Sequence, residues 1–403
     1  MRQGSFGRLL VAAFSAATVL VGGGASALAK EVPAAQPRLV TITIPAPHGE
    51  IPQQWLPYSG PPRANVLLPA GYDPDRRYPL VAALNGLNCS YSWWEQWKLA
   101  DPLAALGAIV VMPEGASGWY SDWWNGGQRG SPSWETYELD TVLPTILHRY
   151  PIRTERRYHA LVGISMGGMG ATYLGGRLPG FFGSVATLSG FVDPQYYAPL
   201  PAVAMGVLAS APLEGDYRLL PVEGPPYGFY MRGHNPTRLV ANLRQTRVFE
   251  STGNGAPSPV AAYNTPGSEL EGIVIYPTSQ RFHNAAVAAG LDITYQPHTG
   301  GHDIPDFLAE VEALAKWDPF APVITHPQSW TNDTVATHGQ LWDVGYRFAQ
   351  PPTKVVQFSR TMDRLSISEA GSDVTITTTA GCTIHTSTPA TVRIPRDSCE
   401  HSA

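Results

Sequence analysis

A Gly-x-Ser-x-Gly pentapeptide at residues 163–167 constrains the fold more than any other stretch of this chain of 403 residues. An apolar run, 158–162, precedes it, and small residues, 167–176, follow it. This order predicts a buried strand, a sharp turn and a helix, with the hydroxyl of Ser165 raised out of the sheet. The flanking glycines are needed because side chains there would collide with the neighbouring strand and helix. The alternative is a glycine-rich turn without catalytic chemistry.

Continuous apolar runs recur along the first 300 residues and indicate strands that are buried on both faces. They alternate with helix-like segments such as 134–150 and 277–290, which predicts an α/β fold with an open, mostly parallel sheet. In such sheets the chemistry takes place at the carboxyl ends of the strands, where Leu87, Ser165 and the loop after Ser251 fall. The runs are 79–84, 108–113, 158–164, 184–189, 247–251 and 293–295, with further β segments at 39–44 and 64–68.

The N-terminus has the layout of an export signal. Arg2 and Arg8 give a charged start, residues 9–21 an apolar core, and Ala27-Leu28-Ala29 a small-x-small cleavage site. We predict that residues 1–29 are a signal peptide and that the protein is secreted or held in the cell envelope. An uncleaved membrane anchor is the alternative, although the apolar core is short and ends in a glycine triplet.

Beyond Trp317 the sequence becomes rich in Thr, Val and Ile, with stretches of alternation such as residues 373–377. These features predict a compact all-β module over 325–403, which serves in binding or wall attachment, or in packing alone. Cys382 and Cys399 lie close enough in the sequence to close a small loop through a disulfide, as suits an exported chain with few cysteines.

A serine hydroxyl is a poor nucleophile unless a base lies within hydrogen-bond reach and a carboxylate orients that base. In a fold of this type the chain order is Ser, acid, His. His302 stands in a glycine-rich loop between the strand 293–295 and the helical run 305–314, a position from which it can reach a serine at the sheet edge. His298 precedes the glycines and later histidines fall in the β-module, so we predict His302 as the base.

The residues alone do not decide which carboxylate is the acid that orients the histidine. Four carboxylates lie between the serine and the histidine in the chain: Glu250, Glu269, Glu271 and Asp292. Glu250 lies inside a strand, where its side chain can face away from the site. Glu269 and Glu271 begin a helical segment, and because they are two positions apart they point to different sides of it, so only one can face the site.

An oxyanion hole needs two backbone N–H groups that point at the developing charge. One is expected from Met166, the residue after the nucleophile, and the other from Leu87, in the loop after an early strand.

Two further features have competing interpretations. Seven of the eleven tryptophans fall between Trp93 and Trp134, which predicts either packing under long surface loops or an aromatic cleft beside the serine for an acyl chain or a sugar. Cys89 is left over from the disulfide, and we interpret it as a buried free thiol because no base accompanies it locally.

An ordered set of short motifs gives the chain a family resemblance. The motifs are Leu84-Asn85-Gly86-Leu87, Val111-Met112-Pro113, Tyr120-Ser121-Asp122-Trp123, Trp134-Glu135-Thr136, Gly163-Ile164-Ser165-Met166-Gly167, Gly253-Asn254-Gly255 and Gly301-His302. With them the chain resembles the esterase branch of the α/β-hydrolases, and within it the antigen 85-type mycolyltransferases of actinobacterial cell envelopes. The resemblance covers about residues 38–315 and implies an α/β-hydrolase catalytic domain over 38–318, with the β-module outside it.

The resemblance also implies roles for single residues. It implies an acyl-enzyme on Ser165 and an acyl group passed on to a sugar or to water. The family's Pro-x-x-x-Leu-Glu stretch matches residues 266–271, which gives the role of the acid to Glu271. We expect Asn85, Asn88 and Trp123 to contact the substrate, as the matching positions of the family imply.

Two departures separate this chain from the family. Asn85 and Asn88 stand where the family has Asp and Arg in contact with a disaccharide, and Asp303-Ile304-Pro305 replaces the aromatic residues that follow the family's histidine. The acceptor of the acyl group therefore need not be trehalose.

We therefore predict an exported serine acyltransferase or esterase that moves an acyl group, for instance a mycolyl group, to a hydroxyl acceptor. The alternatives are a secreted carboxylesterase that gives the acyl group to water, and a non-catalytic protein that binds wall or matrix glycans on the same fold. Expected partners are an acyl-lipid or acyl-sugar substrate and an envelope glycan. A net charge of −5 without a basic stripe argues against nucleic acid, and no residue spacing calls for a metal or cofactor. The sequence leaves the oligomeric state open.

Overall fold

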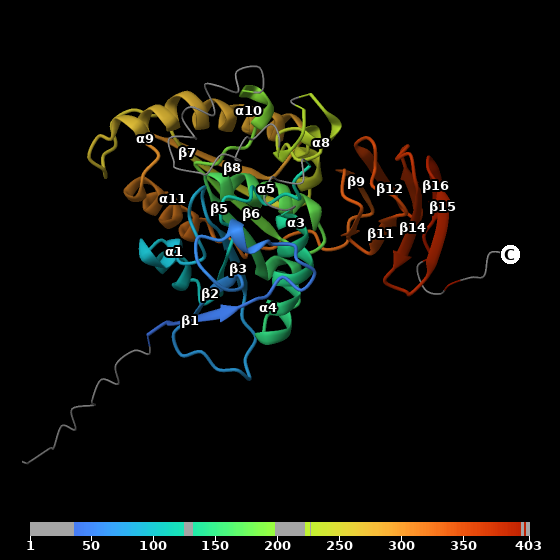
Figure 1. Ribbon diagram of the computed structural model, residues 1–403, viewed down its shortest axis with the longest axis horizontal. Coiled ribbons are helices and arrows are strands. Elements are labelled where there is room, and N and C mark those ends of the chain that lie inside the picture. The colour runs from blue at the N-terminus through green and yellow to red at the C-terminus, as the bar shows by residue number, and fades with distance from the viewer. Residues whose placement is uncertain (1–35, 125–131, 198–221, 226, 396–398, 400–403) are drawn as a thin grey trace, which may run out of the picture. The chain divides into compact units, whose positions relative to one another are not determined.

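The apolar runs of the sequence form an eight-stranded central sheet in the computed structural model, which describes residues 36–124, 132–197, 222–225, 227–395 and 399 (Figure 1). The strand order is β1-β2-β4-β3-β5-β6-β7-β8. Every neighbouring pair from β4 to β8 is parallel, and β2 is antiparallel to both of its neighbours. The predicted α/β class is confirmed. The strands are β1 Arg38–Thr43, β2 Arg63–Leu68, β3 Leu80–Leu84, β4 Ile109–Pro113, β5 His159–Ile164, β6 Ser184–Leu188, β7 Arg247–Gly253 and β8 Ile293–His298.

Alternate residues of the parallel strands face two separate cores, which explains why the runs are apolar throughout. On one face, side chains such as Val81 and Val162 pack against α1, α2 and α11. On the other, side chains such as Leu80 and Leu161 pack against α4, α5 and α10 (Figure 1). The helices are α1 Trp93–Gln96, α2 Asp101–Ala104, α3 Trp134–Thr136, α4 Leu143–Arg149, α5 Met166–Arg177, α8 Phe229–Arg232, α9 Thr265–Glu269, α10 Tyr276–Ala288 and α11 Ile304–Trp317, with π-helical segments at Tyr137–Val142 and Leu270–Ile275 and 3₁₀ turns at Gln53–Trp55, Arg156–Tyr158, Pro194–Tyr197 and Val240–Leu243.

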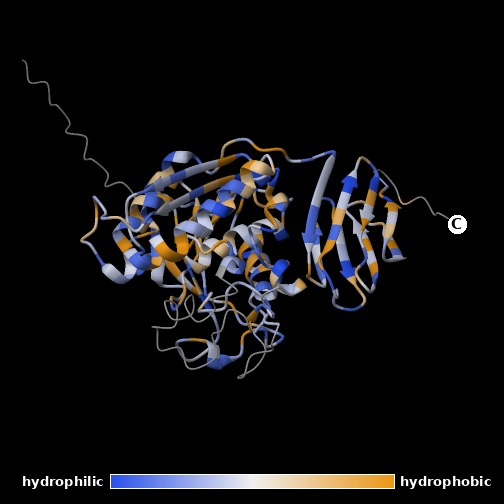
Figure 2. Cartoon of the chain, turned by 90° about the horizontal axis from the view of Figure 1, so that it is seen from above, coloured by the Kyte–Doolittle hydropathy of each residue, from blue (hydrophilic) through white to orange (hydrophobic). Residues whose placement is uncertain are grey.

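The C-terminal residues form two four-stranded antiparallel sheets, β10-β11-β14-β15 and β16-β13-β12-β9, here called the β-sandwich. Hydropathy alternates along these strands, because one side of each sheet faces a shared core that includes Phe348, Phe358 and Ile376 (Figure 2). Cys382 and Cys399 are joined by a disulfide. The strands are β9 Ser329–Thr334, β10 His338–Leu341, β11 Val344–Phe348, β12 Val356–Thr361, β13 Arg364–Ile367, β14 Asp373–Thr378, β15 Thr383–Ser387 and β16 Ala390–Arg393.

Polar contacts join the β-sandwich to the C-terminal end of α5. Asn332 Nδ2 donates to the carbonyl of Gly176 at 2.8 Å, and Arg177 Nη1 donates to Tyr346 Oη at 3.0 Å. Residues 35–403 accordingly form one unit. The division into a catalytic domain over 38–318 and a module over 325–403 stays a prediction.

The signal peptide predicted over residues 1–29 lies outside the described residues. Within the described part of the chain, no helix combines the length and the apolar character that crossing a membrane requires.

Candidate active site

Ser165 lies at the tight turn between β5 and α5. Its backbone has a φ of 59°, a positive value that residues other than glycine rarely adopt. A Cβ on Gly163 would collide with the backbone of Gly167, and a Cβ on Gly167 would collide with that of Leu84. The two glycines thus allow the strand, the turn and the helix to approach closely enough to hold Ser165 in this strained conformation.

His302 follows β8 on a glycine turn that places its imidazole between a hydroxyl and a carboxylate. Its backbone N–H donates to the carbonyl of Gly267 at 3.0 Å, which fixes the turn. Its Nε2 lies 2.9 Å from Ser165 Oγ, and its Nδ1 lies 2.6 Å from Glu271 Oε2. A carboxylate at Nδ1 keeps the proton on that nitrogen, so Nε2 is free to accept the proton of the serine.

Glu271 is fully buried at the start of the π-helical segment Leu270–Ile275. Its Oε1 accepts hydrogen bonds from Ser189 Oγ at 2.8 Å and from Thr252 Oγ1 at 2.9 Å, while its Oε2 faces His302. These bonds compensate for the burial of the charge and fix the plane of the carboxylate.

Two backbone N–H groups lie close to Ser165 without a partner. A Cβ built on Gly86 would lie 3.5 Å from the Cβ of Ser165, so the loop after β3 passes directly beside the nucleophile. Among the described residues, the N–H groups of Leu87 and Met166 donate no hydrogen bond. The N–H of Met166 is also the first of α5, where the helix dipole favours negative charge. This geometry suits an oxyanion beside Ser165.

Comparison with known proteins gives this site a family. Residues 59–316, more than half of the chain, match the family described as Putative esterase. The chain belongs to this esterase family.

Relatives with curated names are similar over the same region. The diacylglycerol acyltransferase/mycolyltransferase Ag85C of Mycobacterium avium is 29% identical over 249 residues, which are 58% of this chain and 68% of the relative. Ag85B of Mycolicibacterium smegmatis, which carries the same enzyme name, is 31% identical over 225 residues, 52% of this chain and 65% of the relative. The chain is therefore similar to enzymes that handle acyl groups.

Solved structures share the fold of the central sheet. MPT51 (FbpC1) of Mycobacterium tuberculosis matches 70% of this chain and 98% of its own, with a TM-score of 0.54 and 20% identity. The S-formylglutathione hydrolase FrmB of Staphylococcus aureus matches 71% of this chain and 100% of its own, with a TM-score of 0.52 and 14% identity. At these identities the likeness shows the α/β-hydrolase fold alone.

Of the four carboxylates considered from the sequence, the structure brings Glu271 to the histidine. Glu269, two residues earlier, is exposed. Glu250 in β7 accepts a hydrogen bond from Ser279 Oγ at 2.7 Å instead, and burial raises its pKa to about 8. Asp292 directly precedes β8, whereas His302 follows it, so the two residues lie at opposite ends of this strand.

Two of the three expected substrate contacts have buried side chains that hydrogen-bond to the backbone of loops, and their roles in binding stay predictions. Asn85 is buried, its Nδ2 donates to the carbonyls of its own loop and of Ala116, and its Oδ1 accepts from the N–H of Gly115 at 3.0 Å. Trp123 is also buried and its Nε1 donates to Gly118 O at 3.0 Å. Both side chains are therefore occupied in shaping loops, whereas Asn88 is exposed and remains a candidate contact.

The tryptophans between Trp93 and Trp134 mostly support packing, which was one of their two interpretations. Four of them are buried in the two cores: Trp94, Trp119, Trp123 and Trp134. Trp97 and Trp124 are the exposed members, at 45% and 52%.

Cys89 is a free, half-buried thiol beside the oxyanion loop. Burial raises its pKa to about 12, so it is protonated and unreactive at neutral pH. In the described part of the chain, no three His, Cys, Asp or Glu side chains are grouped to hold a metal ion.

A second histidine–glutamate pair lies behind Glu271 and was missed from the sequence. His298 Nε2 lies 2.9 Å from Glu310 Oε1, and Ser189 Oγ contacts both Glu310 Oε1 at 3.0 Å and Glu271 Oε1 at 2.8 Å. One signal was available: Glu310 interrupts the apolar stripe of α11 between Phe307 and Leu314, where a carboxylate needs a buried partner.

The shared serine couples the two glutamates. Ser189 has one hydroxyl proton, so it donates to Glu271 or to Glu310 but not to both. Burial raises the pKa of Glu310, while the carboxylate of Glu310, against the effect of burial, raises the pKa of His298 to about 9. The positive charge on His298 compensates Glu310, which leaves the hydroxyl of Ser189 available to Glu271.

Proposed function

We propose that this esterase is an exported serine acyltransferase or carboxylesterase that works through an acyl-enzyme on Ser165. The observation that carries the proposal is the continuous hydrogen-bonded chain from Ser165 Oγ through His302 to Glu271, with the two unpartnered N–H groups of Leu87 and Met166 beside it. A nucleophile, a base, an acid and an oxyanion hole together are the machinery of acyl transfer.

In the acylation step, His302 takes the proton of Ser165 as the hydroxyl attacks the ester carbonyl. The tetrahedral oxyanion accepts hydrogen bonds from Leu87 and Met166, each worth about 3 kcal/mol of transition-state stabilisation. Glu271 stabilises the imidazolium. The ester C–O bond then breaks, and His302 returns the proton to the departing alcohol, which leaves the acyl group on the serine.

The second step repeats the first with a new hydroxyl. His302 deprotonates the acceptor, which attacks the acyl-enzyme and releases Ser165. The acceptor is a sugar or other alcohol in a transferase and water in an esterase. The names of the relatives favour transfer, and the change from Asp and Arg to Asn85 and Asn88 favours an acceptor other than trehalose.

Export is supported by the predicted signal peptide and by the disulfide between Cys382 and Cys399, because disulfides persist in oxidising compartments.

The partition between acceptors tests the reaction class. The protein is incubated with a trehalose fatty-acyl ester and with radiolabelled trehalose, glucose or glycerol. A labelled ester establishes the transferase, and free fatty acid alone establishes the esterase.

Ser165→Ala tests the mechanism itself. We expect kcat for p-nitrophenyl butyrate to fall by about ten-thousand-fold or more, with an unchanged melting temperature, because only the nucleophile is lost. A fluorophosphonate probe should label the wild type and not the variant. An unlabelled wild type without ester turnover would instead support the binding protein without catalysis.

A further inference from the structure

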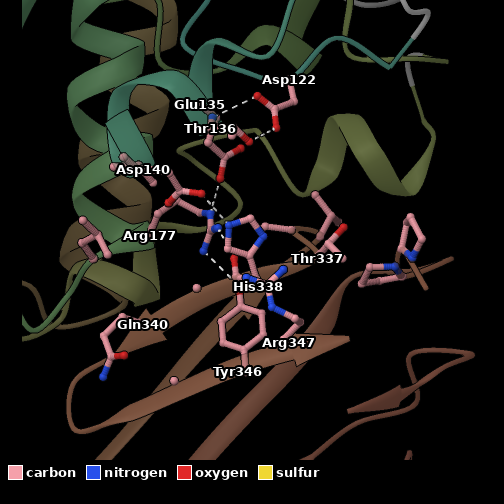
Figure 3. A pocket seen from close by; sticks show the side chains of 18 of the residues that line it. Asp122, Glu135, Thr136, Asp140, Arg177, Thr337, His338, Gln340, Tyr346 and Arg347 are labelled. Carbon is pink, nitrogen blue, oxygen red and sulfur yellow. Dashed lines mark hydrogen bonds and ion pairs between the residues drawn. The ribbon is translucent and has the colours of Figure 1, made fainter. Parts of the chain in front are cut away.

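A cavity of about 910 Å³ lies between the β-sandwich and the C-terminal end of α5 (Figure 3). Arg177 lines it, whereas Ser165, Glu271 and His302 do not. Helix α5 has 12 residues, and a rise of about 1.5 Å per residue puts the cavity about 18 Å from the nucleophile. It is therefore separate from the acyl-transfer site.

The floor of the cavity is a buried, internally neutralised ion pair. Arg177 Nε donates to Glu135 Oε1, its Nη1 to Tyr346 Oη at 3.0 Å and its Nη2 to the carbonyl of His338 at 2.9 Å (Figure 3). Glu135 also accepts from Tyr173 Oη at 2.7 Å. The floor thus presents fixed, satisfied groups and little net charge.

The wall formed by the β-sandwich is a polar sheet face. In the strand register, Arg347 lies opposite His338 on β10 and opposite Thr375 on β14, so their side chains share one side of the sheet. Gln340 and Thr377 lie on the same side, two residues along each strand. Among the described residues the guanidinium of Arg347 has no hydrogen-bond or ion-pair partner, so its donors are free for a ligand.

Aromatic side chains also line the cavity. They are Trp124, which is 52% exposed, and Phe229 and Tyr230 of α8. Tyr230 Oη donates to the carbonyl of Asp122, which holds this ring in place. A lining that combines aromatic rings with hydroxyl, amide and guanidinium groups suits a ligand with apolar faces and a polar edge.

We propose that this cavity is a glycan-binding site for a neutral oligosaccharide, which would contact Trp124 and the polar face of β10, β11 and β14. Sugar rings have the required combination of an apolar face and hydroxyls at the edge. The volume accommodates about two or three sugar rings.

The charges argue for a neutral ligand. Three carboxylates, two guanidiniums and two imidazoles line the cavity, so opposite charges nearly balance. Asp140 is paired with His338 at 2.6 Å, and His234 Nε2 lies 3.4 Å from Glu135 Oε2. A polyanion would be repelled by the carboxylates, and a cationic ligand would meet the free Arg347. The site goes beyond the proposed acyl transfer and does not depend on it.

Calorimetric titration of the secreted full-length chain tests the proposal. The probes are maltotriose, cellotriose and galactotriose as neutral trisaccharides, with trigalacturonate as an anionic one. We expect binding of at least one neutral trisaccharide, weakened by about tenfold or more in Trp124→Ala and in Arg347→Ala, as for residues that contact a ligand directly. Arg364→Ala is the matched control, because Arg364 is an exposed arginine of β13 in the other sheet.

Four other results of the titrations would overturn the proposal. Binding that is lost in Ser165→Ala would place the sugar in the active site, and binding equal in all variants would place it elsewhere; both overturn the proposal. Stronger binding of trigalacturonate than of the neutral sugars, or binding of none, overturns it as well. The outcome is independent of ester turnover, so failure of the acyl-transfer proposal is distinguishable.

Discussion

The two ends of helix α5 differ in backbone strain and in how fully their hydrogen-bond donors are paired. At its N-terminal end Ser165 has a positive φ, and the N–H of Met166 donates to no described residue. At its C-terminal end Arg177 is saturated with acceptors, from Glu135 to Tyr346 of the β-sandwich. The first end thus combines a strained residue with a free donor, whereas the charge of the second end is paired and its donors are satisfied.

The contrast indicates a division of labour along one helix. A strained turn persists only when the surrounding structure over-determines it. Around Ser165 the restraint comes from the tight packing of Gly163 and Gly167. Arg177 instead holds the opposite end of α5 to Glu135 and to the β-sandwich. Changes at the first end should therefore alter chemistry without stability, and changes at the second should alter stability without chemistry.

The largest effect is expected from Glu271→Gln at the catalytic end. An amide at this position favours the wrong tautomer of His302, so kcat/KM for p-nitrophenyl butyrate should fall by about 10³- to 10⁴-fold. The melting temperature should change little. Glu269→Gln is the matched control, because Glu269 lies two residues away and is exposed. Equal losses in both variants would show that neither is the acid.

A smaller effect, on stability, is expected from Arg177→Met at the other end. The change removes the guanidinium partner of the buried Glu135 and leaves only His234, whose Nε2 lies 3.4 Å from Glu135 Oε2. It should lower the free energy of unfolding by about 3–5 kcal/mol in urea titrations. The double variant Arg177→Met/Glu135→Gln should recover part of the loss, because no uncompensated charge remains. A loss of kcat per folded molecule would contradict the separation of the two ends.

The pH dependence of this pair has a definite sign. Although burial alone would raise it, the charge of Arg177 lowers the pKa of Glu135 from 4.5 to about 2. The pair should therefore stabilise the fold fully above about pH 4.5, and the contribution should be lost as the pH falls through 2. In Glu135→Gln the acid-induced loss between these values should be smaller, as thermal unfolding from pH 6 to 2 would measure.

Sequence reasoning reached the catalytic end because its signals are local. Gly163, Ser165 and Gly167 lie in one turn, and His302 lies in one loop whose glycines are visible in the sequence. The acid was harder: periodicity left Glu269 and Glu271 equivalent, and the family motif was needed to choose between them. The two differ in burial, because the helix places them on different sides: Glu271 is buried and Glu269 is exposed.

The other end could not be predicted, because its contacts are non-local. Arg177 donates a hydrogen bond to Tyr346, which lies 169 positions later in the chain. No sequence pattern near either residue predicts this contact. The contacts of Asn85 are non-local in the same way. The amide of Asn85 hydrogen-bonds to the backbone of Gly115 and Ala116. These residues are about thirty positions away in the chain, and only the fold brings them close.

An intermediate effect on chemistry is expected from Ser189→Ala. The change leaves Glu271 Oε1 with the hydrogen bond from Thr252 alone, and loss of a hydrogen bond to a charged group should lower kcat by about tenfold, with KM nearly unchanged. Ser189 is a positioning residue, so the pH profile of kcat should also shift as Glu310 loses its shared hydroxyl. Ser184→Ala is the control, because Ser184 begins β6, the strand that ends just before Ser189, and its buried hydroxyl has no hydrogen-bond partner. Identical kinetics in the two variants would contradict the inference that Ser189 couples the two glutamates.

The smallest effect is expected from Tyr346→Phe, which removes one acceptor of Arg177 and keeps the ring in the core of the β-sandwich. The free energy of unfolding should fall by about 1 kcal/mol, because Arg177 retains Glu135 and the carbonyl of His338. Tyr263→Phe, at a side chain 59% exposed, should change nothing. Ester turnover should equal that of the wild type in both variants. A drop in kcat confined to Tyr346→Phe would mean that the β-sandwich acts on Ser165 through α5. That result would contradict the separation of the two ends of the helix.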